Sequence, residues 1–213
     1  MQMFGFIHSD SRLGRALNTI ADIMALSVLW LVCSLPIVTI GTSTTALYCA
    51  SMRSVLQQGS VFRDFFRAFK QNFKQGLCLT LLAFLIILLL TADFWLLSKV
   101  QIPGEVLLRI VLYIIVFLVV TVMSYVFPLV ARFSCTIKKH LKNALLLGVS
   151  CPLTTVMLVV VNLAPYLFLM LKPGWFFRVL PLFTLIWTGA AAYLNSWLLL
   201  KLFQRIQRKS DGK

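Results

Sequence analysis

Long uninterrupted apolar runs dominate the pattern of the chain. Leu81–Leu90 reads LLAFLIILLL and Val111–Val122 reads VLYIIVFLVVTV, without the polar face that a helix on a soluble protein repeats every three or four residues. Each run lies within a stretch that exceeds the roughly 18–20 apolar residues needed to cross a bilayer. The pattern therefore predicts an all-α membrane protein, a polytopic helical bundle that forms one integral membrane domain over residues 1–213.

Turn residues divide most of this apolar sequence into membrane spans. Four spans are expected, at about 76–98, 106–131, 144–171 and 176–203. Pro-Gly pairs follow the first and third of these spans and mark tight turns, so we expect two hairpins, over 76–131 and 144–203. Pro152 falls inside the third span, where a membrane helix tolerates a proline as a kink.

The first apolar region, residues 16–57, is broken between Pro36 and Gly41. Its first half is long enough for one crossing, a proline then stops the helix, and hydroxyl residues suited to capping a new helix follow. The helix-break candidates are Pro36, Gly41, Thr42, Ser43 and Thr44. Either the remainder completes a third hairpin, with Arg53 snorkelling and six segments in total, or it is a re-entrant half-helix. In the second case, free backbone N–H groups after Gly41 would face an anion or a polar ligand.

Residues 61–75 have the pattern of an amphipathic helix in the headgroup layer. Phenylalanines recur at three- and four-residue steps and basic residues follow on a neighbouring face, so we expect contact with the lipid bilayer and its anionic headgroups. The helix is either a connector lying on the membrane or a surface that docks a partner. The candidates for this interface are Phe62, Arg63, Phe65, Phe66, Arg67, Phe69, Lys70, Phe73 and Lys74.

Charge sets the expected orientation. The chain has 20 Lys and Arg against 6 Asp and Glu, and 16 of the basic residues lie in the segments 1–15, 53–75, 132–142 and 201–213. With six segments, all four of these lie on one side, which the positive-inside tendency makes cytoplasmic. We therefore expect a multi-pass protein of the cell membrane with both termini in the cytoplasm. Basic residues spread over short gaps do not form one nucleic-acid-binding face, so we expect no nucleic acid partner.

Four polar residues within the spans are candidates for an intramembrane site, and the two acidic ones stand out most because a charged residue at the bilayer centre costs about 2.5–3.5 kcal/mol. They are Asp22, Asp93, Asn162 and Asn195. For Asp22 and Asp93, the functional interpretation is a proton- or cation-coupled site. The alternative is that Asp22 pairs with Arg15 or a neighbouring loop, and Asp93 with Lys99 or Arg109. No catalytic motif is present, so no catalytic residue, cofactor or metal ligand is predicted.

The runs LVCSLPIVTIGTSTTALY (residues 31–48) and FRDFFRAFKQNFK (residues 62–74) resemble the YesL-like family of bacterial integral membrane proteins, a domain of unknown function. The resemblance implies a membrane protein encoded beside carbohydrate-uptake systems. We therefore expect a non-enzymatic accessory component linked to carbohydrate uptake, with a membrane transporter subunit or a second copy of itself as partner. The alternative is a small-solute transporter or channel that uses the broken first region, with Asp22, Asn162 or Asn195 facing a cavity.

Overall fold

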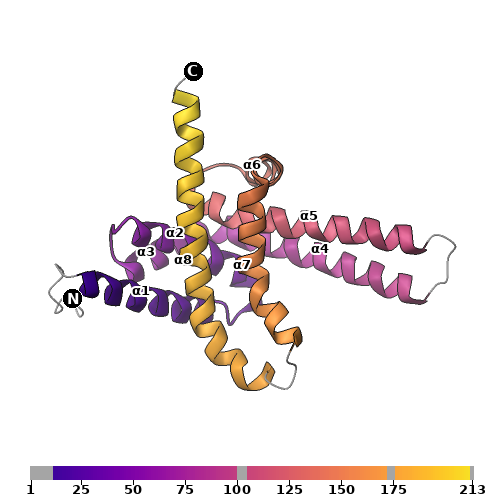
Figure 1. Cartoon of the computed structure of the whole chain (residues 1–213), viewed down its shortest axis with the longest axis horizontal. Helices are drawn as coiled ribbons and strands as arrows, with labels where there is room; N and C mark the ends of the chain where they lie inside the picture. The colour runs from indigo at the N-terminus through magenta and orange to yellow at the C-terminus, as the bar shows by residue number, and fades with distance from the viewer. Residues whose placement is uncertain (1–11, 100–104, 172–175, 212–213) are drawn as a thin grey trace.

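The computed structural model describes residues 12–99, 105–171 and 176–211, and the regular secondary structure in these ranges is entirely helical (Figure 1). Side chains of residues 12–13, 15–16, 165–171, 176–185 and 206–211 lie outside this description. The elements are α1 (Arg12–Cys33), the short 3-10 helix η1 (Ile37–Thr39), α2 (Ile40–Val55), α3 (Val61–Gln71), α4 (Phe73–Lys99), α5 (Glu105–Arg132), α6 (Ile137–Ser150), α7 (Pro152–Leu171) and α8 (Phe176–Asp211).

Helix α2 lies at the centre of the fold. It packs against α1, α3, α4, α5 and α8, and most of its residues are buried although many are Gly, Ala, Ser or Thr. Two glycines permit the close crossing of α2 and α4. A Cβ on Gly41 would lie 2.4 Å from Thr80 Oγ1, and a Cβ on Gly76 would lie 2.6 Å from the Cα of Thr42. Small residues allow helix backbones to approach closely, which is how membrane helices pack tightly.

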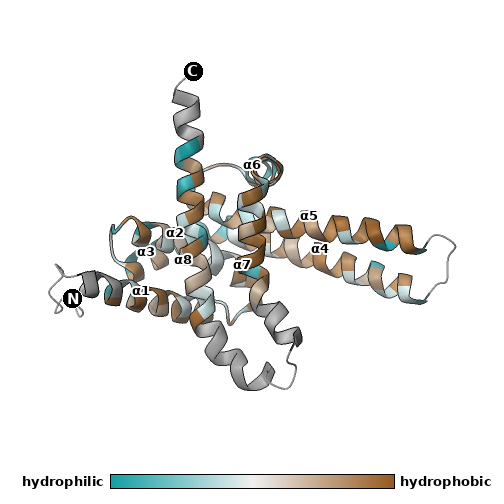
Figure 2. Ribbon diagram, in the orientation of Figure 1, coloured by the Kyte–Doolittle hydropathy of each residue, from teal (hydrophilic) through white to brown (hydrophobic). Residues whose placement is uncertain are grey.

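Helices α4 and α5 form a long hairpin that extends away from the other helices (Figure 1). Within the described ranges, these two helices are long and apolar enough to cross a membrane. Only 6% of the apolar stretch of α4 and 11% of that of α5 are buried inside the protein. Figure 2 shows both helices mostly in the brown of hydrophobic residues. The predicted hairpin over 76–131 therefore corresponds to α4 and α5, and its surface is suited to lipid.

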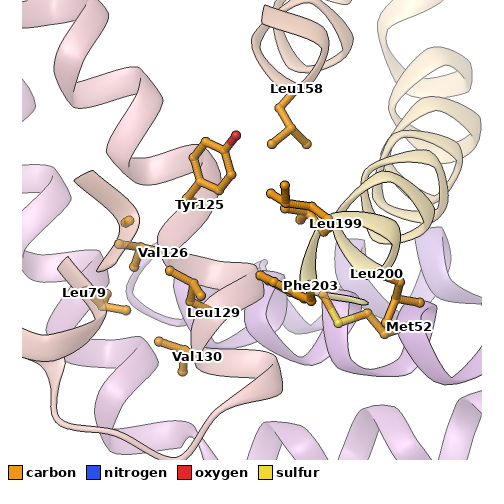
Figure 3. Packing of buried hydrophobic residues seen from close by; sticks show 12 residues of the cluster. Met52, Leu79, Tyr125, Val126, Leu129, Val130, Leu158, Leu199, Leu200 and Phe203 are labelled. Atoms are coloured by element: carbon orange, nitrogen blue, oxygen red, sulfur yellow. The ribbon is translucent and has the colours of Figure 1, made fainter. Parts of the chain in front are cut away.

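The larger buried cluster joins the base of this hairpin to α7 and α8. Tyr125 and Leu129 of α5, Leu158 of α7, and Leu199 and Phe203 of α8 point toward one another in Figure 3. A smaller cluster packs α1, α2, α3 and the middle of α8 together. The hydrophobic core thus surrounds α2, whereas the distal half of the hairpin contributes little to it.

The predicted span over 144–171 is not one straight helix. Helices α6 and α7 meet at Cys151 and differ in direction by 107°. Pro152 is the first residue of α7, where its missing N–H is no loss. Thr155 Oγ1 lies 2.9 Å from the Gly148 carbonyl oxygen and 3.0 Å from that of Cys151, which closes the corner. The proline thus marks a sharp break rather than a kink. If α6 and α7 count as one broken span, the described residues contain up to three candidate membrane spans. The six segments expected from the sequence remain a prediction.

The break in the first region lies at Ser34–Pro36, between α1 and η1. Thr39 Oγ1 lies 2.7 Å from the carbonyl oxygens of both Cys33 and Pro36, so it holds the turn together. Gly41, Thr42, Ser43 and Thr44 lie inside the first turns of α2 rather than ahead of it. With 16 residues, α2 is about 24 Å long, which is shorter than the roughly 30 Å hydrocarbon core.

Candidate functional site

Successive residues of helix α3 are rotated by about 100° around the helix axis, and its side chains fall on three distinct faces. Asp64, Phe65 and Ala68 are buried, and α3 packs mainly on α2. Phe62 and Phe66 lie on a second face and are 53% and 46% exposed. The third face is basic and consists of the exposed Arg63, Arg67 and Lys70.

The aromatic residues of this segment therefore do not share one exposed face. Phe65 is fully buried, and its ring stacks on that of partly buried Phe69 at 6.3 Å between centroids. The predicted helix over 61–75 also ends earlier, at Gln71. Phe73 and Lys74 belong to the first turn of α4, and both are exposed. The sequence pattern groups the phenylalanines by spacing alone, whereas packing against α2 selects one of them for the core.

Asp64, the only acidic residue of α3, is turned toward α2. Its Oδ1 accepts a hydrogen bond from Arg53 Nη1 at 2.5 Å, and the residue is 5% exposed. The connecting loop closes over the carboxylate, because Gly59 has a φ of +82° and a Cβ there would lie 2.3 Å from Asp64 Oδ2. Arg53, expected to snorkel, is instead bonded to Asp64. The outward surface of α3 consequently carries only positive charge.

The two asparagines among the intramembrane candidates meet in the interior. Asn195 of α8 is fully buried, and its Nδ2 donates to Asn162 Oδ1 of α7 at 3.0 Å and to the Tyr48 hydroxyl of α2 at 3.2 Å. Asn162 Nδ2 approaches Ser124 Oγ of α5 at 3.4 Å. Side chains from four helices thus form one polar chain, which we call the asparagine network.

The sequence provides little sign of the other two members of this network. Tyr48 and Ser124 stand among apolar residues, where a tyrosine or serine is too common to stand out. Asn195 Oδ1 is buried without a hydrogen-bond partner among the described residues. An unpaired buried polar atom of this kind costs about 1–3 kcal/mol, so the network is only partly satisfied.

The two acidic candidates lie elsewhere. Asp22 on α1 accepts a hydrogen bond from Ser54 Oγ, in the last turn of α2, at 2.7 Å, and the side chain of its predicted partner Arg15 lies outside the description. Asp93 is exposed near the far end of α4. Its predicted partners have other contacts, because Arg109 forms an ion pair with Glu105 and Lys99 lies 6.0 Å from the Trp95 ring centroid. Asp22, Asp93 and the asparagine network do not form one site.

Helix α4 packs against the start of α2, where the helix-break candidates Gly41 and Thr42 lie. Gly41 N–H donates to Thr80 Oγ1 at 2.9 Å, and Thr42 Oγ1 donates to the Phe73 carbonyl at 3.3 Å. The indole N–H of Trp30 donates to Thr44 Oγ1 at 3.1 Å. Ser43 Oγ is buried and has no hydrogen-bond partner in the described part of the chain. The start of α2 is therefore a helix-packing point, and the N–H of Gly41 is bonded to protein.

Over the residues that the structure describes, the protein is all-helical, with two helices, or up to three spans if α6 and α7 count as one, that are long and apolar enough to cross a membrane. The sequence profile of the family described as "Protein of unknown function, DUF624" matches residues 23–94. The matched segment runs from α1 through α2 and α3 to near the end of α4, so it covers the central helix and the Arg53–Asp64 pair. No curated protein and no solved structure matches the chain significantly. Within the described ranges, no three His, Cys, Asp or Glu side chains gather as metal ligands do.

Proposed function

We propose that this protein is a non-enzymatic accessory component of the cell membrane, which binds another membrane protein through the outward face of α3. The observation that carries the proposal is the orientation of α3. Its one acidic side chain is buried, while Phe62 and Phe66 are exposed beside three cations. Aromatic residues and arginine are enriched at protein interfaces, where they supply most of the binding energy.

The attachment of α3 to the fold supports a rigid docking surface. The buried Phe65 and Ala68 fasten one side of the helix, and the Arg53–Asp64 pair fastens its first turn. A partner would therefore meet exposed side chains on a helix that is already ordered, which lowers the entropy cost of binding. Both chain termini are placed in the cytoplasm in this proposal, on the side of the basic segments.

The link to carbohydrate uptake rests on the resemblance to the YesL-like family, and the DUF624 match carries no function of its own. A subunit of a carbohydrate transporter is accordingly the partner that we propose first, and a second copy of this chain is the next. Genome neighbourhood is an association and not a mechanism, so the partner must be found by direct binding.

The test is affinity purification of the tagged full chain from native membranes in mild detergent, followed by mass spectrometry. We expect a membrane protein at near-stoichiometric amounts. The variant with Arg63→Glu, Arg67→Glu and Lys70→Glu should lose it, because charge reversal changes attraction into repulsion. Phe62→Ala with Phe66→Ala should weaken recovery as well.

The matched control reverses three other exposed cations, through Lys99→Glu on α4 and Lys201→Glu and Arg205→Glu on α8. This control should retain the partner. Recovery of the partner by the α3 variant in a well-folded state contradicts the docking assignment. Purification of the wild-type protein without any other membrane component contradicts the accessory role itself.

The asparagine network favours a second candidate function, a small-solute transporter or channel. Asn162 and Asn195 lie together in the interior, and Asn195 Oδ1 is free to accept a hydrogen bond from a polar solute. Broken helices beside polar side chains are typical of substrate sites in transporters. The proposal predicts solute flux into liposomes that Asn195→Leu abolishes and Asp22→Asn, outside the network, leaves intact. Equal flux for wild type and Asn195→Leu contradicts it.

A further inference from the structure

Two basic segments that are far apart in the sequence meet at the base of the α4–α5 hairpin. Gln75 Nε2, in the first turn of α4, donates to the Cys135 carbonyl in the α5–α6 loop at 3.1 Å. This bond ties the end of segment 53–75 to segment 132–142. The exposed cations on either side of it are Lys74, Arg132, Lys138, Lys139 and Lys142, which we call the hairpin-base cluster.

The charge-free lengths of the hairpin place this cluster at a membrane surface. No charged residue occurs between Lys74 and Asp93 in α4 or between Arg109 and Arg132 in α5. At 1.5 Å per residue, the 18 residues of 75–92 and the 22 of 110–131 span about 27 Å and 33 Å. These two lengths lie just below and just above the roughly 30 Å thickness of the hydrocarbon core. Phe94 and Tyr113, with ring centroids 5.6 Å apart, lie toward the opposite end, as aromatic residues do at membrane interfaces.

The exposed residues of helix α6 independently indicate the same position for the membrane surface. Its inward face carries the buried His140 and Ala144. On the opposite face, positions at three- and four-residue steps form one exposed stripe, which reads Lys138, Lys142, Leu145 and Val149. The stripe changes from cationic to apolar within one turn. A stripe with this change is suited to a helix that passes from the headgroup layer into the acyl chains.

We propose that the hairpin-base cluster is a binding site for the headgroups of anionic phospholipids. The five cations lie at the depth where lipid phosphates lie, and Asp64, the one acidic residue in the two segments, is buried and bonded to Arg53. A lipid at this site places its phosphate among Lys74, Arg132 and the α6 lysines and its acyl chains along the exposed apolar sides of α4 and α6. The site is separate from the outward face of α3, so it does not depend on the proposed protein partner.

The test is native mass spectrometry of the full chain titrated with phosphatidylglycerol or with zwitterionic phosphatidylcholine. We expect phosphatidylglycerol to bind more tightly. Lys138→Gln with Lys142→Gln should weaken its first binding constant at least about fivefold, the effect of about one basic residue near an anionic surface. Phosphatidylcholine binding should not change. The matched control, Lys99→Gln with Arg109→Gln, removes the same charge at the other end of the hairpin and should bind phosphatidylglycerol as wild type does.

Three outcomes overturn the assignment. One is equal affinity of the wild-type protein for the two lipids, and another is loss of less than about twofold in the α6 variant. The third is an equal loss in the control, which would indicate a general charge effect. Monodisperse elution of each variant in size-exclusion chromatography shows that it is folded. If the α6 variant instead loses a co-purified protein and keeps phosphatidylglycerol, the cluster is a protein interface.

Discussion

Helix α2 and the α4–α5 hairpin reverse the relation between hydrophobicity and burial that holds in soluble proteins. The hairpin consists of two long apolar helices whose apolar stretches are only 6% and 11% buried, whereas α2 is rich in Ala, Ser and Thr and lies at the centre. In lipid, an exposed leucine is already in an apolar solvent, so helices associate through close packing and polar contacts. In such a chain, hydrophobicity indicates contact with lipid, and small residues indicate the core.

The largest expected effect tests the close crossing at α2. Gly76→Val would place a Cβ 2.6 Å from the Thr42 backbone, so the two helices must separate. Because the obstacle is backbone, we expect a loss of about 3 kcal/mol in the free energy of unfolding, the upper end of the cost of overpacking. Titration of the protein with sodium dodecyl sulfate measures it. Ala92→Val, at an exposed position of the hairpin, should change this free energy by less than about 0.5 kcal/mol.

The next effect concerns the attachment of α3 to the last turn of α2. Arg53→Ala removes the partner of the buried Asp64 carboxylate and should destabilise the protein by about 2 kcal/mol. We set this below the cost for a fully buried pair, because the Arg53 side chain is 46% exposed and solvent screens it. Asp64→Asn leaves no buried charge and should cost less than Arg53→Ala. An equal or larger loss for Asp64→Asn would show that Arg53 is not what offsets the buried charge.

Sequence patterns predict the helical class and the two long apolar helices α4 and α5 well, because both depend on uninterrupted apolar runs. They predict the break near Pro36 and the corner at Pro152 less well, since proline shows where a helix is perturbed but not by how much. The 107° corner depends on Thr155 contacts with the carbonyls of Gly148 and Cys151, which lie one or two turns back along the chain.

Residue spacing along the chain predicts only those features of the candidate sites that lie within a single helix. The basic stripe of α3 follows from three- and four-residue steps, and so does the exposure of Phe62 and Phe66. The burial of Phe65 and the pairing of Arg53 with Asp64 depend on the tertiary contact of α3 with α2. Asn162 and Asn195 stood out as polar residues in apolar spans, whereas their contact joins positions 33 residues apart on different helices.

A smaller effect is expected for the asparagine network. In a double-mutant cycle, Asn162→Ala and Asn195→Ala should show a coupling energy of about 0.6 kcal/mol and no more than about 1.7, the range measured for hydrogen bonds between membrane helices. Unfolding in sodium dodecyl sulfate again supplies the four free energies. Pairing Asn195→Ala with Leu88→Ala, on the distant hairpin, should give additive losses. Additivity within the asparagine pair would contradict the contact.

The smallest expected effect, that of Leu88→Ala, is the sharpest test of the comparison, because Leu79→Ala on the same helix is its reference. Leu79 of α4 is fully buried at the base of the hairpin, and Leu88 is 55% exposed farther along. The reference substitution, Leu79→Ala, should cost at least about 2 kcal/mol, as in the core of a soluble protein, because it leaves a cavity. Leu88→Ala should change the free energy of unfolding by less than about 0.5 kcal/mol, because lipid fills the space that the side chain leaves. If Leu88→Ala also costs more than 2 kcal/mol, protein covers the hairpin in the membrane, and a second copy of the chain becomes the first partner to test by crosslinking.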